Sequence, residues 1–485
     1  MLTYQDYIAA VASGELLSFI QRAIQQHMGS PEYLIARDAD EYDHQRDVTV
    51  NNYTKFIAEH AASEFVNATA ANNRISSNFF RRLNTQRCTY LLGNGVSFVN
   101  HITETTNADG NVVQIDETKR RLGPRFDRDF YRLAYCALIH REAFGYWSRD
   151  NDGKERLYVF TLLEFVPLRD EITGALRAGI RFWRISPDKP LNAVLYDEQG
   201  FTTYASRPGT TGYDMVEVQP RTAYIINGYR TAAEGFQPTG FSNYSTLPII
   251  CMKGSDLYQS TLVGMRERID SYDLIQSGFA NDLQDCAQIY WIIENCGGMN
   301  EADLRAFLNK LNRDHIATAD TKGMGVESSS LKPYVQDVPF ESRTAYLQHI
   351  RSAIYEDYGA LDVTNMAAGD RTATEIEAAF QPLDETADDF ETQCTDAIQQ
   401  LLTILGIDDE PRYKRNRIIN QLEQTQMVAL MAQYLDIRTL LEHLPWLTVD
   451  EVTNIITRLD AEADKRAPAD DDDETTPPDD DAQEA

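Results

Sequence analysis

The 485-residue sequence lacks the short motifs that mark the commonest enzyme classes. It has no GxxxxGK[ST] loop to cradle phosphate, no GxGxxG fingerprint, no HExxH zinc motif and no GxSxG nucleophile elbow. Its six cysteines form no CxxC pair and have no histidine at zinc-ligand spacing. We therefore expect reduced, mostly buried thiols, and a protein without catalytic residues, metal or cofactor.

Positive charge is scarce as well. The chain has 45 Lys and Arg against 75 Asp and Glu, a formal net charge of -30. Residues 467–485 hold nine of the acids and no base, so we expect a disordered tail, but without it the charge is still about -21. A surface of this sign repels phosphate, which disfavours a conventional nucleic-acid-binding module. DNA can still pass along such a surface without adhering.

Long apolar runs are also missing. No stretch approaches the roughly 20 residues that span a bilayer, and the N-terminus lacks the basic start of a signal peptide. The hydrophobic fraction of 42% is ordinary for a globular protein. Because the chain exceeds the roughly 250–300 residues that one core serves, we expect a soluble protein with two or more substructures and no membrane partner.

The first half of the chain changes from helical to strand patterning. Apolar residues recur at helical spacing over 15–27 and 73–92. Between about 145 and 250, short apolar runs alternate with turn sequences such as Asp152-Gly153 and Lys189-Pro190. This pattern predicts an antiparallel sheet flanked by helices, that is, an α+β fold.

A long amphipathic stretch follows Pro248. Ser255 is a plausible N-cap, and some thirty residues at 1.5 Å each predict a rod of roughly 45 Å ending near Cys286. Its apolar stripe is Leu262, Met265, Ile269, Tyr272, Phe279 and Leu283. A lone rod has too little of its own domain to bury this stripe, so we expect packing against a neighbour.

The next part of the chain contains a small module and a second rod. A strand-like run near 290, a helix over 300–314 and an extended stretch over 325–335 predict a small β-α-β module. A second rod, 341–358, carries Tyr346, Ile350 and Ile354 on one face. After a break at 362–370 comes a helix over 371–405, in which Pro382 predicts a kink or junction, and a strand-like return over 411–419.

Three stretches resemble those of one protein family. Residues 81–98, RRLNTQRCTYLLGNGVSF, resemble a family motif in which a helix ends at the sequence LLGNPV. Here Gly95 stands in place of the usual proline. The stretch 412–420 resembles the family's RN-containing strand. The pattern PII, Ser and IDxYDxxxSxxxNDxxD is carried by Pro248, Ile249, Ile250, Ser255, Ile269, Asp270, Tyr272, Asp273, Ser277, Asn281, Asp282 and Asp285. In these sequence motifs and in the order of its parts, from about residue 30 to residue 465, the chain resembles the tailed-phage portal proteins.

The resemblance implies a portal-type subunit with a mixed α/β wing, two long stem helices, a small β-α-β clip and a helical crown. It divides the chain into wing 1–250, stem helix 251–286, clip 287–339, stem helix 340–361, tunnel loop 362–371, long helix and return strand of the wing 372–420, crown 421–466 and disordered acidic tail 467–485.

The resemblance also implies functional residues. The tunnel loop that touches DNA would use Thr364, Asn365, Met366, Gly369 and Arg371. In the stem, Arg266, Arg268, Asp270, Arg343 and Arg351 either face the channel or pair with acids between subunits. Docking residues in the clip would be Trp291, Glu301, Arg305 and Lys310.

The implied assembly is a ring of twelve subunits at the capsid vertex of the virion, assembled in the host cytoplasm. Its axial channel would pass double-stranded DNA during packaging and ejection. The implied partners are the terminase large subunit, the head-completion adaptor protein, and the major capsid and scaffolding proteins.

Two alternatives stay open. Asp270, Asp273, Asp282 and Asp285 fit solvated charge on a helix face, but Asp282 and Asp285 could instead hold a divalent metal in a nucleic-acid hydrolase. The other alternative is a virion assembly protein without a channel.

Overall fold

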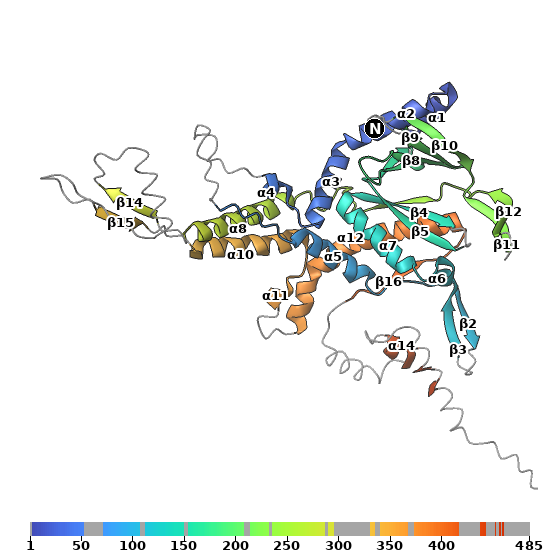
Figure 1. Cartoon of the computed structure of the whole chain (residues 1–485). Helices are drawn as coiled ribbons and strands as arrows, with labels where there is room; N and C mark the ends of the chain where they lie inside the picture. Colours follow the sequence, from blue (N-terminus) through green and yellow to red (C-terminus); the bar gives the residue numbers. More distant parts are fainter. Residues whose placement is uncertain are drawn as a thin grey trace, which may run out of the picture.

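The structure is a computed structural model of the whole chain (Figure 1). It describes residues 2–52, 71–106, 112–149, 154–207, 214–231, 235–286, 290–294, 330–334, 340–366, 373–416, 437–442, 452, 455–456 and 458–459. A broad body of helices and antiparallel sheets carries a long pair of helices that protrudes from one side (Figure 1). The predicted α+β class is therefore confirmed.

Four helices begin the chain: α1 (Tyr4–Ser13), α2 (Leu16–Met28), α3 (Pro31–Asp43) and α4 (Val48–Asn52). Thr3 and Asp6 form a capping box at the start of α1, and Gly14 ends that helix with a positive φ of 74°. Phe19, Ile20 and Ile24 of α2 are fully buried against the larger sheet. The helical periodicity predicted over 15–27 is confirmed.

The larger sheet has five antiparallel strands in the order β10-β9-β8-β7-β6. Their bounds are β6 (Phe165–Arg169), β7 (Leu176–Trp183), β8 (Asn192–Asp197), β9 (Gly200–Ser206) and β10 (Met215–Thr222). Each strand pairs with its neighbour in sequence, as expected for runs separated by short turns. The predicted antiparallel region is thus present.

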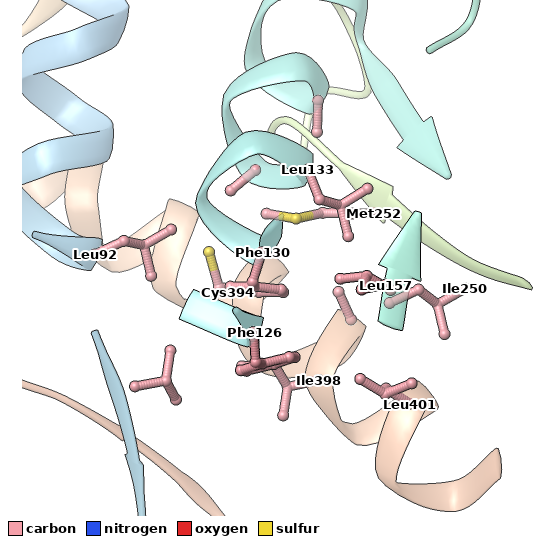
Figure 2. Packing of buried hydrophobic residues seen from close by; sticks show 14 of the residues in the cluster. Leu92, Phe126, Phe130, Leu133, Leu157, Ile250, Met252, Cys394, Ile398 and Leu401 are labelled. Atoms are coloured by element: carbon pink, nitrogen blue, oxygen red, sulfur yellow. The ribbon is translucent and has the colours of Figure 1, made fainter. Parts of the chain in front are cut away.

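A smaller sheet, β13-β4-β5, lies at the centre of the body. It joins β4 (Glu142–Arg149) and β5 (Glu155–Thr161) to β13 (Ile249–Lys253). Three helices, α5 (Phe79–Leu92), α7 (Phe126–His140) and α12 (Ala373–Leu405), pack with it around one apolar core. In Figure 2, Phe130 and Leu133 of α7 face Leu157 and Ile250 of the sheet and Ile398 of α12.

Short strands complete the body. The pairs β2 (Ile102–Thr106) with β3 (Val112–Asp116) and β11 (Ile225–Thr231) with β12 (Gly235–Ser242) are hairpins. A short helix, α6 (Glu117–Leu122), follows β3. The pair β1 (Val96–Phe98) with β16 (Pro411–Tyr413) joins segments more than 300 residues apart. The return strand after α12 was predicted, whereas the β2–β3 hairpin was not.

The protruding part consists of α8 (Arg266–Cys286) and α10 (Phe340–Tyr358), which lie side by side (Figure 1). We call these two helices the rod. At its outer end, β14 (Tyr290–Glu294) pairs antiparallel with β15 (Ser330–Tyr334). Both strands of the predicted β-α-β module are present, and its helix, 300–314, lies outside the described residues.

The predicted start of the first long helix is wrong. Ser255 is not its N-cap, because α8 begins at Arg266 and residues 254–265 form turns. The N–H groups of Gly254 and Thr261 donate to the carbonyls of Arg141 and Leu138 at 2.9 and 3.1 Å, at the C-terminal end of α7. The last carbonyls of a helix have no partner within it, so this demand for hydrogen bonds overrides the helical periodicity of the segment. Gly264, with a φ of 86°, then redirects the chain into α8.

The predicted helix over 73–92 also starts late. Residues 71–77 are extended, and α5 begins at Phe79. The backbone N–H groups of this extended segment donate to side chains of α8 instead of to their own helix. A contact between segments about two hundred residues apart thus decides the local conformation.

Near the C-terminus, α11 (Val363–Met366) is followed by α12, which continues through Pro382 without a break. The proline therefore does not mark a junction. Of the predicted crown, 421–466, the structure describes α14 (Ile437–Glu442) and a few further residues, and the acidic tail lies outside them.

One glycine in the larger sheet is required by close packing. A Cβ atom on Gly179 of β7 would lie 2.0 Å from the ring of Phe165, which is itself fully buried. We expect Gly179→Ala to lower the free energy of unfolding by about 1–3 kcal/mol, because the core must shift to admit the methyl group. Gly240→Ala is the matched control, since nothing lies within 4 Å of its Cβ position on β12. Denaturant unfolding of both variants measures the difference, and equal stabilities would contradict the packing explanation.

Candidate functional site: the rod and the segment that follows it

The rod is buried at its root and exposed further out. Ile269 of α8 and Ile354 of α10 are 1% and 0% exposed, inside a cluster that includes Leu83 of α5. Towards the outer end, Leu283 and Tyr346 are 50% and 48% exposed. Of the predicted apolar stripe, Leu262, Met265 and Ile269 are buried near the body, Phe279 packs against Phe340 of α10, and Leu283 is half exposed.

All four arginines of the rod pair with acids of the same chain. Arg266 lies 3.0 Å from Asp38 of α3, Arg268 pairs with Asp357 across the rod, Arg343 pairs with Asp282, and Arg351 lies 3.1 Å from Asp362. Sequence reasoning placed these arginines either in the channel or between subunits. The structure shows a third arrangement, in which each arginine pairs with an acid of its own chain.

These pairs leave the rod with an excess of negative charge. Together α8 and α10 carry eight Asp and Glu residues, four arginines and no lysine. Each arginine is already neutralised by an acid, so it attracts an external phosphate only weakly. The rod is thus an acidic element that offers no strong grip on DNA.

Asp270 belongs to the root of the rod. Its carboxylate accepts hydrogen bonds from the hydroxyl groups of Tyr42 and Thr49, the latter at 2.7 Å, and lies 3.8 Å from the guanidinium of Arg266. Burial raises the pKa of Asp270 above its usual range, while the bond from Tyr42 acts in the opposite direction. Asp270 therefore fastens α8 to the N-terminal helices.

A row of polar side chains on α8 receives the extended segment 71–77. The members of this row are four residues apart, which is about 6 Å along a helix. In an extended chain, every second N–H group points to the same side and repeats at nearly the same distance, so the two rows match. The N–H groups of Ser77, Ile75 and Asn73 donate to Asp273 Oδ2, Ser277 Oγ and Asn281 Oδ1 at 2.9, 2.9 and 2.6 Å. We call this row of hydrogen bonds the ladder.

The ladder corrects the prediction of solvated charge on this helix. Asp273 is 0% exposed, and Ser277 and Asn281 are also buried. The signal in the sequence was the spacing of Asp273, Ser277 and Asn281 at i, i+4 and i+8, which places short polar side chains on one line of the helix. The extended partner could not be inferred, because nothing in residues 71–77 marks them for α8.

The end of α10 and the following segment are clamped by α5. Gln86 Nε2 donates to the carbonyl of Leu361 at 3.0 Å, and the N–H of Leu361 donates to Gln86 Oε1 at 3.2 Å. The buried Arg87 donates to the carbonyl of Tyr358 at 3.0 Å and lies over its ring. Asp362 accepts from the N–H of Thr364 at 3.1 Å and so supports the start of α11.

The remaining predicted site residues lie partly beyond the described chain. Thr364 is exposed in α11, and the backbones of Asn365 and Met366 complete that helix. Gly369 and Arg371 are outside the described residues. Trp291 lies in β14 opposite Pro333, while Glu301, Arg305 and Lys310 are also outside them.

Among the described residues, no helix is long and apolar enough to cross a membrane, and no group of acids, histidines or cysteines could hold a metal ion. Of the two acids proposed for a metal-dependent hydrolase, Asp282 is paired with Arg343. A cation in contact with a carboxylate opposes metal binding there. Among the described residues, the polar contacts of the rod therefore hold it to the body and join its two helices, which is a structural role.

Comparison with known proteins shows the family to which the chain belongs. The family model "Phage portal protein, SPP1 Gp6-like" matches residues 35–469, so the chain belongs to this family of portal proteins. It is a structural component of the phage virion at the head–tail junction, not an enzyme, and the hydrolase alternative is excluded.

Two relatives are portal proteins of named phages. The chain is 27% identical over 399 residues to the portal protein of Clostridium phage phiCD119, covering 79% of this chain and 83% of that protein. It is 22% identical over 383 residues to the portal protein of Bacillus phage SPP1, covering 76% and 68%. A chain from the neck of a native gene transfer agent particle aligns over 76% of this chain and 90% of its own, at 13% identity and a TM-score of 0.37. The assignment does not depend on that structural likeness.

The clamp on Leu361 allows a test. Replacing Gln86 with Ala removes the partners of both polar backbone groups of Leu361, and we expect a loss of about 1–2 kcal/mol in the free energy of unfolding. Gln86→Glu keeps the acceptor for the N–H and loses the donor for the carbonyl, so its loss should be smaller. Thermal unfolding and hydrogen exchange over 356–366 measure both. Unchanged exchange in this segment in Gln86→Ala would show that the clamp does not hold it.

Proposed function

We propose that this portal protein forms a ring of twelve subunits in which the rod is the stem around an axial channel for double-stranded DNA. The main support is the rod itself, whose apolar side chains are buried at the root and increasingly exposed outwards. Leu283 and Tyr346 would then be covered by neighbouring subunits, since exposed apolar side chains on one helical pair are stabilised by packing against another.

The electrostatics of the rod support the same function. DNA carries one negative charge per roughly 1.7 Å, and affinity rises with the number of phosphates that Lys and Arg neutralise. The arginines of the rod are paired within the chain, so an acidic wall would lower adhesion and favour sliding of the duplex.

The parts of the subunit would follow the family plan. Residues 1–250 and 372–420 would form the wing, 251–286 and 340–361 the stem, 287–339 the clip and 421–466 the crown. The clip, with Trp291, Glu301, Arg305 and Lys310, would bind the terminase large subunit during packaging and the head-completion adaptor afterwards. The wing would meet the major capsid and scaffolding proteins at the vertex.

Residues 362–371 would form the tunnel loop. Support comes from the clamp of Gln86 on Leu361 and from Arg351 on Asp362, because together they fix the point from which this segment leaves the rod. Thr364, Asn365, Met366 and Gly369 would contact the duplex by shape and hydrogen bonds. Arg371 would add the one fixed positive charge.

Electron microscopy of the purified protein in negative stain tests the assembly directly. We expect rings with a central hole. Monomers or open filaments would contradict the channel and favour a virion assembly protein without one.

The tunnel-loop proposal is tested by Arg371→Ala. We expect normal rings but fewer DNA-filled particles, because the loop loses its positive charge next to the phosphates. Arg268→Ala is the control, since it removes an equal charge that is paired with Asp357 on the rod. Arg371→Lys should retain packaging. The measurement is the yield of DNA-filled heads in infected cells, and equal yields from the Arg371 and Arg268 variants would refute the assigned contact.

A further inference from the structure

The innermost rung of the ladder contains two buried acids in contact. Asp273 of α8 is 0% exposed, and Asp47, just before α4, is 1% exposed. The adjacent residues Ser76 and Ser77 bring the two acids together at the root of the rod, because the N–H of Asp47 donates to Ser76 Oγ at 3.1 Å and the N–H of Ser77 donates to Asp273 Oδ2 at 2.9 Å. Among the ion pairs between described residues, none includes either acid, so no described cation compensates their charge.

In each of the two carboxyl groups, one oxygen, called the outer oxygen, accepts a backbone N–H, and the other, called the inner oxygen, does not. Asp273 Oδ2 accepts the N–H of Ser77 at 2.9 Å, and Asp47 Oδ1 accepts the N–H of Val50 at 2.9 Å. The hydroxyl oxygen of Tyr42 lies 3.2 Å from Asp47 Oδ1, but its proton is donated to Asp270. The remaining oxygens, Asp273 Oδ1 and Asp47 Oδ2, are buried and have no partner. The buried hydroxyl group of Ser77 lies beside Asp273, but its one proton cannot satisfy both inner oxygens.

Two ionised carboxylates in this position would be costly. An ionised carboxylate only accepts hydrogen bonds, and two unscreened negative charges in a buried site repel strongly. One additional proton turns the repulsion into an O–H···O⁻ hydrogen bond, which is among the stronger hydrogen bonds in proteins. A proton held between Asp273 Oδ1 and Asp47 Oδ2 would give both buried inner oxygens a partner.

We propose that Asp47 and Asp273 form a proton-binding site that latches the extended segment 71–77 and α4 to the root of α8. The shared proton satisfies both inner oxygens. The outer oxygens stay free to hold the N–H groups of Ser77 and Val50. Release of the proton leaves two buried negative charges at the rung that joins the segment to the rod, and the ladder opens from that rung.

The surroundings favour retention of the proton. The charged or titratable groups next to Asp47 are Asp270 of α8 and Tyr42 of α3, and Arg266 of α8 lies 3.8 Å from Asp270. Arg266 is itself engaged by Asp38 and Asp270. Burial raises the pKa of Asp273 to about 7, and the neighbouring charge of Asp47 acts in the same direction, against the N–H bond from Ser77.

The sign of the pH effect follows from these values. In the closed ladder Asp273, whose pKa is raised to about 7, keeps its proton up to about pH 7, whereas an exposed Asp loses it near pH 4. Between about pH 4 and pH 7, opening of the ladder therefore releases one proton. The stability of the closed ladder falls as the pH rises through this range. The opening constant should rise tenfold per pH unit and level off above about pH 7.

Hydrogen–deuterium exchange of the full-length protein tests this site. We expect protection of peptides covering 71–78, corrected for the intrinsic exchange rate, to fall tenfold per unit from pH 5 to pH 7. A peptide within α7 is the internal control and should not follow this slope. A wild-type segment whose corrected protection is independent of pH would overturn the proposal.

Two amide substitutions replace the proton with a permanent donor. In Asp273→Asn and Asp47→Asn, the new NH₂ group can donate to the opposing oxygen while the amide oxygen keeps the outer bonds. Each variant should hold the segment closed at pH 8 and lose the pH slope. Asp270→Asn is the matched control and should retain the slope, since Asp270 already has two hydroxyl donors.

The same exchange experiments distinguish proton binding by the two acids from binding of a metal ion. If Ca²⁺ at pH 8 restored protection in the wild type, and both amide variants were less protected than the wild type at every pH, the pair would bind a cation instead. Circular dichroism checks that each variant is folded. All these outcomes are independent of ring formation or DNA packaging, so they stand apart from the proposed channel.

Discussion

The buried amide of Asn84 joins the two helices of the rod at the place where they enter the body. Its oxygen accepts hydrogen bonds from the hydroxyl groups of Thr261, just before α8, and Tyr358, at the end of α10, each at 2.8 Å. A rod that protrudes from a domain is anchored at one end only, so its direction depends on this junction. Leu83, Ile269 and Ile354 exclude water around the amide, which strengthens these hydrogen bonds.

From this junction outwards, the interactions that hold the rod change in kind. Apolar burial dominates at the root, the ladder from Asp273 to Asn281 fastens the middle of α8 to the extended segment, and Arg343 with Asp282 links the two helices further out. Surface ion pairs contribute little to stability, typically below about 1 kcal/mol. The outer rod is therefore the part that its own chain stabilises least.

The arginines show how charge serves this arrangement. Arg266 ties α8 to α3, and Arg351 ties α10 to Asp362. Such contacts give direction and register to long helices, because a planar guanidinium binds a carboxylate in a fixed orientation. The same contacts neutralise the positive charges of the rod, so one set of ion pairs orients the helices and leaves the rod acidic.

The sequence by itself determined the periodic features: the antiparallel strands, the second rod from Phe340 to Tyr358, the helical character of Ala373–Leu405, and the family, which depends on the order of these parts. These properties are local, because they follow from spacing along the chain. Tertiary structure decided where α8 begins, why residues 71–77 are extended and which acid each arginine binds. In each case a polar group is satisfied by a partner far away in sequence. The carbonyls of α7, the polar row on α8 and the acid on α3 have no signature in the segments that they bind, so only the folded chain brings them together.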